Sequence, residues 1–80
     1  MIIQNKLSDS MVAKIAKSGK NPIQGFIQCN VMIKPNSEQE KALKSNVIRL
    51  YRIKSNIFGA SFNSTSLDPL TNLNFVIRIF

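Results

Sequence analysis

The middle of the chain carries a run of basic residues with no acidic residue among them. The run consists of Lys41, Lys44, Arg49, Arg52 and Lys54, and no Asp or Glu occurs from position 41 to position 67. Clustered Lys and Arg side chains bind the phosphates of a nucleic acid or the carboxylates of an acidic protein surface. A helix face that only meets solvent commonly alternates both signs of charge. The run therefore predicts a binding surface, and an ordinary solvated helix face is the alternative interpretation.

A second basic group lies nearer the N-terminus and consists of Lys6, Lys14, Lys17 and Lys20, of which the last three are candidate binding residues. Lys14 and Lys17 are neighbours if this segment is a helix, because they are three positions apart. Solubility alone explains such a group. It strengthens the case for binding only if the fold places both basic groups on one side, and on that condition we include it in the candidate surface.

The residues that support enzyme chemistry are scarce. The chain has no histidine, which excludes His-based acid–base catalysis and Ser-His or Cys-His nucleophiles. The single cysteine, Cys29, falls on an apolar strand face and is expected to be buried. The four carboxylates all have helix-start or turn roles to fill: Asp9, Glu38, Glu40 and Asp68. We therefore expect no enzyme activity, no cofactor, no metal site and no small-molecule substrate.

Length and composition set the class of protein. Eighty residues form one domain over 1–80, and the 44% hydrophobic content with 19% charged residues is typical of a folded chain. The net charge is +7. No apolar run resembles a signal peptide or reaches transmembrane length. We expect a soluble intracellular protein, in the cytoplasm, an organelle or a virus-infected cell, that does not bind membranes.

The first half of the chain has two helix-start signals and one strand pattern. Ser8 is an expected N-cap and Gly19 an expected stop, which predicts a helix near 9–18. Alternating apolar residues from Ile27 to Ile33 predict a strand that ends before Pro35. The second helix start is the capping-box pattern over 37–40.

The end of that second helix is ambiguous. With 100° per residue, Leu43, Val47, Leu50 and Tyr51 share one side, and the basic run occupies another. A strand over 47–53 would mix apolar and basic residues on both faces, although its β-branched residues favour a strand. We predict a helix over 38–53, with its basic face as the binding surface.

The C-terminal third reads as two strands joined by a loop. Positions 57–62 alternate, residues 63–72 form a loop around Asp68-Pro69, and 73–80 alternate again. Ile2 and Ile3 could add a leading edge strand. The order α-β-α-β-β predicts a small two-layer α+β sandwich of about two helices on a three- or four-stranded sheet. The β-α-β part should give parallel strands, and the last two strands could form a long-looped hairpin.

Aromatic residues on a sheet would indicate base stacking, as in proteins that bind single-stranded RNA. Most of the aromatic residues fall on faces assigned to the core: Phe58, Phe62, Phe75 and Tyr51. Phe26 and Phe80 are better candidates for exposure. No aromatic-basic signature of a known RNA-binding motif is present.

The sequence thus predicts a small, basic, non-enzymatic binding protein associated with nucleic acid or a ribonucleoprotein. The alternative is a linker or assembly subunit, or a viral-type inhibitor, that binds acidic protein surfaces in a larger complex. The C-terminal strand ending at Phe80 could also pair with another chain and give a homo- or hetero-oligomer.

Overall fold

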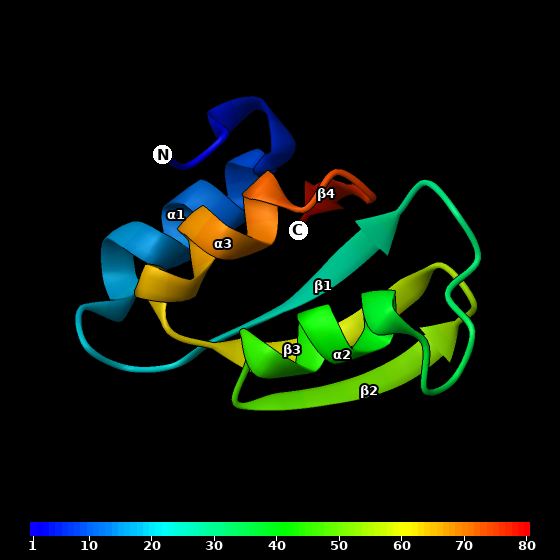
Figure 1. Ribbon diagram of the computed structural model, residues 1–80. Coiled ribbons are helices and arrows are strands. Elements are labelled where there is room, and N and C mark those ends of the chain that lie inside the picture. Colours follow the sequence, from blue (N-terminus) through cyan, green and yellow to red (C-terminus); the bar gives the residue numbers. More distant parts are fainter.

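The computed structural model describes all 80 residues and combines a four-stranded sheet with three α-helices (Figure 1). Two short 3₁₀ turns, Gln4–Lys6 and Ser64–Ser66, complete the regular structure. The elements in chain order are α1 (Asp9–Ser18), β1 (Ile23–Cys29), α2 (Glu38–Ser45), β2 (Arg49–Lys54), β3 (Ile57–Phe62), α3 (Leu67–Asn72) and β4 (Val76–Ile79). The predicted α+β class is confirmed, with one helix more than expected.

The strands lie in the order β2-β3-β1-β4, and every neighbouring pair is antiparallel. Since β3 is antiparallel to both β1 and β2, these two strands run parallel with β3 between them. From β1 onward the element order is β-α-β-β-α-β, that of the split β-α-β, or ferredoxin-like, motif. The predicted hairpin of the last two strands is wrong, because β1 separates β3 from β4 and α3 connects them.

Both predicted helix starts are confirmed by their caps. The Ser8 hydroxyl accepts a hydrogen bond from the Met11 N–H, and the Ser37 hydroxyl accepts one from the Glu40 N–H. Gly19, with φ of 56°, ends α1 in a backbone conformation that favours glycine. The Glu40 carboxylate differs from the capping-box prediction, because it accepts from the N–H of Asn36 rather than from that of Ser37.

The predicted helix over 38–53 is wrong, because α2 ends at Ser45 and the segment from Arg49 is strand β2. Asn46 caps the helix end, with its side-chain amide donating to the carbonyl of Ala42. Pairing with β3 then satisfies the backbone of β2. Leu43 on α2 and Leu50 on β2 contact the same core from two different elements. Their spacing therefore resembles one face of a single helix, although no such helix forms.

The first strand lies earlier than predicted. It begins at Ile23, before the expected segment, and ends at Cys29. Beyond it Val31 is exposed, whereas Ile33 is buried and donates its N–H to the carbonyl of Ser55. The burial prediction for Cys29 is confirmed.

Both ends of the chain also differ from expectation. The segment 63–72 contains α3, and Pro69 fits there because the first turn of a helix needs no donor from it. In β4 the inward residues are Val76 and Ile79, so the alternation expected over 73–80 is wrong. Ile2 and Ile3 form no strand, although Leu7 makes a single parallel bridge to Ile79 at the outer edge of β4.

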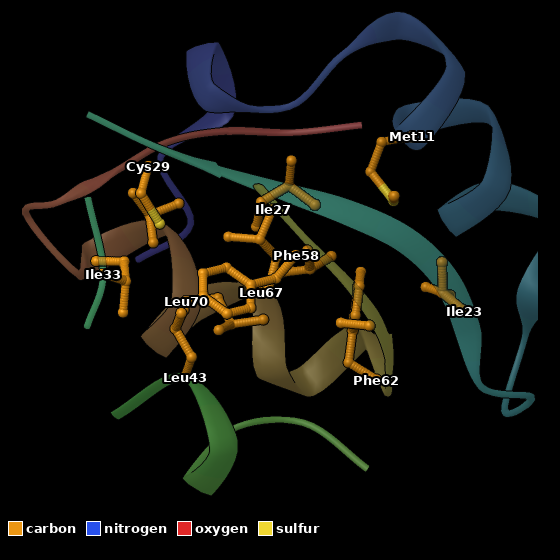
Figure 2. Packing of buried hydrophobic residues seen from close by; sticks show 13 residues of the cluster. Met11, Ile23, Ile27, Cys29, Ile33, Leu43, Phe58, Phe62, Leu67 and Leu70 are labelled. Carbon is orange, nitrogen blue, oxygen red and sulfur yellow. The ribbon is translucent and has the colours of Figure 1, made fainter. Parts of the chain in front are cut away.

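One face of the sheet carries the core, which Figure 2 shows from close by. Alternate residues of β1 point into it, and Phe58 and Phe62 of β3 are 1% and 0% exposed. The helices contribute the covering side chains: Met11 from α1, Leu43 from α2, and Leu67 and Leu70 from α3. Because burying a large apolar side chain contributes about 1.5–3 kcal/mol, this cluster supplies the main driving force for folding. All three helices therefore pack on the same face.

Candidate nucleic-acid interface

The other face of the sheet has no helix packed on it, and we call it the open face. Residues that pair across an antiparallel sheet point to the same side, so the strand register identifies its side chains. It is formed by Gln24, Phe26 and Gln28 of β1, Arg49, Tyr51 and Lys54 of β2, Ile57, Gly59 and Ser61 of β3, and Arg78 with the following Phe80.

Three aromatic residues form one line across the open face, which we call the aromatic row. Tyr51 pairs with Gly59, Gly59 pairs with Phe26, and Phe26 exchanges backbone hydrogen bonds of 2.7 and 2.9 Å with Phe80. The rings of Phe26 and Phe80 are stacked with centroids 5.5 Å apart. Tyr51 is 55% exposed and Phe26 is 37% exposed. The expected exposure of Phe26 is confirmed, whereas Phe80, also expected to be exposed, is half-buried, and the placement of Tyr51 against the core is wrong.

Gly59 allows the Tyr51 ring to lie flat on the sheet. A Cβ atom at this position would overlap the far end of the Tyr51 ring, so only a residue without a side chain fits beneath it. The ring therefore extends from β2 over β3 toward Phe26. Tyr51 thus covers β3 with its ring, whereas Phe26 and Phe80 stack their rings on each other.

Basic side chains flank the aromatic row on both sides. Arg49 is in register with Ser61 on one side, and Lys54 with Ile57 on the other. Arg78 stands in register with Gln28, and its guanidinium lies 5.8 Å from the centre of the Phe80 ring. None of the three basic residues forms an ion pair. The open face therefore presents unpaired positive charge beside exposed aromatic rings.

All four acidic residues of the chain lie elsewhere. Each sits in the first turn of a helix, where a negative charge is favourable: Asp9 in α1, Glu38 and Glu40 in α2, and Asp68 in α3. No strand contains an acidic residue. The open face consequently has no acidic side chain that would repel a phosphate.

The predicted basic strip is divided by the fold. Lys41 and Lys44 lie on α2, each with its ammonium 3.6 Å from a carboxylate oxygen of Glu38 or Glu40. Arg52 points to the core side, where it bonds to Glu40 at 2.9 Å and lies 4.8 Å from the Phe58 ring. Arg49 and Lys54 belong to the sheet instead, as described above. The expected single helical surface is therefore wrong.

Glu40 is held in its ionised form by its neighbours. The hydrogen bond from the Asn36 N–H lowers the pKa of the Glu40 carboxyl, and that from the Arg52 side chain lowers it further. Partial burial acts in the opposite direction without overcoming them. The charges of Arg52 and Lys44 are thus engaged by a permanent negative charge and are less available to a partner.

A hollow of about 390 Å³ lies on the open face beside Tyr51. Its polar lining comes from Gln24, Arg49 and Ser61, and Pro22, Ile48 and Ala60 complete it. This size falls within the range of small-ligand sites. It offers an aromatic wall together with an amide, a hydroxyl and a guanidinium, which suits a nucleobase or a sugar.

The N-terminal basic group is also divided. Lys14 and Lys17 line a second hollow with Pro22, Ile23 and Gln24, next to the one described above. Lys20 instead lies with Gly19 beside residues 63–65, after the end of α1. Lys14 and Lys17 therefore adjoin the open face, and Lys20 does not line either hollow.

No cluster of residues suited to metal binding occurs in the structure. The Cys29 thiol is buried, and its burial raises the pKa to about 11, so that it stays protonated at neutral pH. None of the helices combines the length and apolar character needed to span a bilayer.

Tyr51 and Arg78 are the open-face residues that sequence reasoning missed. The alternation of Gln24, Phe26 and Gln28 with buried neighbours over 23–29 was the signal that could have revealed this face. Arg78 carries no local signal, because only the register of β4 beside β1 places it near Phe80. Comparisons with protein-family models, with curated proteins and with solved structures found no match.

Proposed function

We propose that this protein binds single-stranded nucleic acid on its open face. Nucleobases stack on the aromatic row, and the phosphates contact Arg49, Lys54 and Arg78. The observation that carries the proposal is the strand register that aligns Tyr51, Phe26 and Phe80 between these unpaired cations, on a face without acidic side chains.

The geometry of the aromatic row favours a single strand over a duplex. In a duplex the base faces are stacked on one another, whereas unpaired bases can turn their faces toward a protein ring. Neighbouring strands are about 4.8 Å apart, so Tyr51 on β2 and Phe26 on β1 stand about 10 Å apart along the row. Stacking on an aromatic side chain contributes about 1–3 kcal/mol per base and tolerates any base. Binding should therefore show little sequence preference.

The charges on the open face suit a phosphate backbone that crosses the sheet. Three contacts on a single strand predict that log affinity falls with log salt at a slope of about −2, or about −0.7 per contact. An acidic protein would use the same cations, but it has no need of aromatic rings aligned between them. Its binding would depend less steeply on salt where an apolar contact carries the affinity.

A pair of charge-matched variants tests which surface binds. Arg49→Gln with Arg78→Gln removes two charges from the open face, and Lys41→Gln with Lys44→Gln removes two from α2. We expect the first variant to weaken binding of a fluorescent oligo-dT or oligo-U and to make the salt slope shallower by about 1.4. The second variant should bind nearly as the unmodified chain does. Fluorescence anisotropy at several salt concentrations measures both.

A substitution in the aromatic row tests stacking separately from charge. Phe26→Leu keeps an apolar side chain in the strand and removes the ring, so it should lower affinity by roughly 5- to 150-fold, the equivalent of 1–3 kcal/mol. Equal losses in both charge variants would contradict the proposal, as would tighter binding to duplex than to single strand. Failure of any oligonucleotide to bind would leave the acidic-protein alternative as the better account of the surface.

A further inference from the structure

The open face adjoins a second hollow that lies beside α1. The hollow beside Tyr51 and the neighbouring hollow of about 410 Å³ share two lining residues, Pro22 and Gln24. The first belongs to the open face, and the second is lined by Lys14 and Lys17. A chain-like ligand that leaves the aromatic row past Gln24 therefore comes next to these two lysines.

Lys14 is held at the point where the two surfaces meet. Its ammonium donates to the main-chain oxygen of Gln24 at 3.0 Å, two residues before Phe26. At Gln24 strand β4 no longer pairs with β1, because Phe80 is opposite Phe26. The lysine thus covers the exposed edge of β1, and an ammonium has two more donors to offer a phosphate.

Lys17 lies one helical turn beyond Lys14 on the same side of α1. Neither lysine forms an ion pair, and the acidic residue of α1, Asp9, lies in its first turn at the opposite end. Lys14 and Lys17 therefore add two unpaired charges to the three of the open face. The charge sequence Arg78, Arg49, Lys14, Lys17 continues from the sheet around the edge of β1.

We propose that Lys14 and Lys17 bind the phosphates of a nucleic-acid strand after it leaves the aromatic row across Gln24 and Pro22. This inference rests on the proposed function and deepens it, because it extends the binding site beyond the sheet. The ligand is then a strand several nucleotides longer than the sheet alone can hold, and short oligonucleotides use only part of the site.

The test compares a tetranucleotide with a dodecanucleotide of the same base, using the whole chain and its Lys14→Gln/Lys17→Gln variant. The unmodified chain should bind the longer strand more tightly and with the steeper salt slope. In the variant that slope should become shallower by about 1.4, or about 0.7 per lost contact, while binding of the tetranucleotide stays the same within twofold. Circular dichroism confirms that the variant is folded.

Two controls separate charge at this position from charge in general. Lys20→Gln removes one lysine of the same region that lines neither hollow. This variant should still bind the dodecanucleotide more tightly than the tetranucleotide. Lys14→Arg/Lys17→Arg keeps both charges and should do the same. A gain with length that survives in the Lys14→Gln/Lys17→Gln variant overturns this inference and leaves the proposed function standing. Absence of binding to either oligonucleotide overturns both.

Discussion

The two faces of the sheet use the same kinds of side chain in opposite ways. On the helical face Phe58 is fully packed, and Arg52 is bonded to Glu40. On the open face Tyr51 is 55% exposed, and Arg49 has no acidic partner. Residue type therefore does not distinguish a packed from an exposed position in this protein. The side of the sheet on which the residue lies does.

The difference between the faces follows from where the acids are placed. A carboxylate in the first turn of a helix caps free N–H groups and complements the helix dipole, and all four acids occupy such positions. Because the helices cover only one face, the negative charge gathers on that side. The charged residues of the strands are all basic, and three of them remain on the open face without an ion pair: Arg49, Lys54 and Arg78.

The largest expected effect contrasts one phenylalanine from each face. Phe58→Ala should lower the free energy of unfolding by about 3–5 kcal/mol, because it leaves a cavity in the core. Phe26→Ala should cost about 1 kcal/mol or less, the contribution of a cross-strand aromatic pair. Urea unfolding followed by circular dichroism measures both. Equal losses would mean that the open face is packed as tightly as the core.

A smaller effect contrasts the two glycines that face opposite sides. At Gly25 a Cβ atom would overlap the Met11 side chain and approach the backbone oxygen of Phe80 to 2.9 Å. Gly25→Ala should therefore cost about 1–3 kcal/mol through overpacking. Gly59→Ala meets only the movable end of Tyr51, so its cost should stay below about 1 kcal/mol while the ring lifts away from the sheet. Thermal unfolding compares the variants, and a larger loss at Gly59 than at Gly25 would contradict the expected movement of the Tyr51 ring.

The third contrast concerns the pH dependence that Glu40 gives to the helical face. The pKa of Glu40 is lower in the folded chain than its usual value of 4.5, so its ion pairs stabilise the fold above that value. This stability is lost as the pH falls through the folded-state pKa, because the carboxyl becomes protonated. In Glu40→Gln the free energy of unfolding should fall less steeply below pH 4.5 than in the unmodified chain. In Arg49→Gln, on the open face, it should fall as steeply as in the unmodified chain. Urea unfolding midpoints measured from neutral pH down to about pH 3 test this. If Glu40→Gln lost stability with acid as steeply as the unmodified chain, Glu40 would not be the source of the pH dependence.

The predictable part of the fold rested on local signals. Ser8, Gly19 and Ser37 marked helix ends because a cap depends only on a few neighbouring residues. The strand at 57–62 was recognised because its alternation matches a sheet with one buried face. These features follow from short stretches of sequence.

The unpredicted part depended on partners distant in the sequence. Residues 49–54 fit a helix by periodicity, and only pairing with β3 makes them a strand. The same error assigned Tyr51 to the core and placed Arg49 and Arg52 on one surface. Phe80 and Arg78 reach the open face through pairing with β1, about fifty residues earlier in the chain. The candidate site could therefore be predicted in its charge, but not in its position.

The most direct test of the central claim is a titration of the ¹⁵N-labelled protein with a single-stranded oligo-dT or oligo-U, followed by amide chemical shifts. The account predicts the largest shifts at Phe26, Tyr51, Gly59 and Phe80, with little change over α2. Shifts concentrated on Lys41 and Lys44 instead, with the open face unchanged, would contradict it.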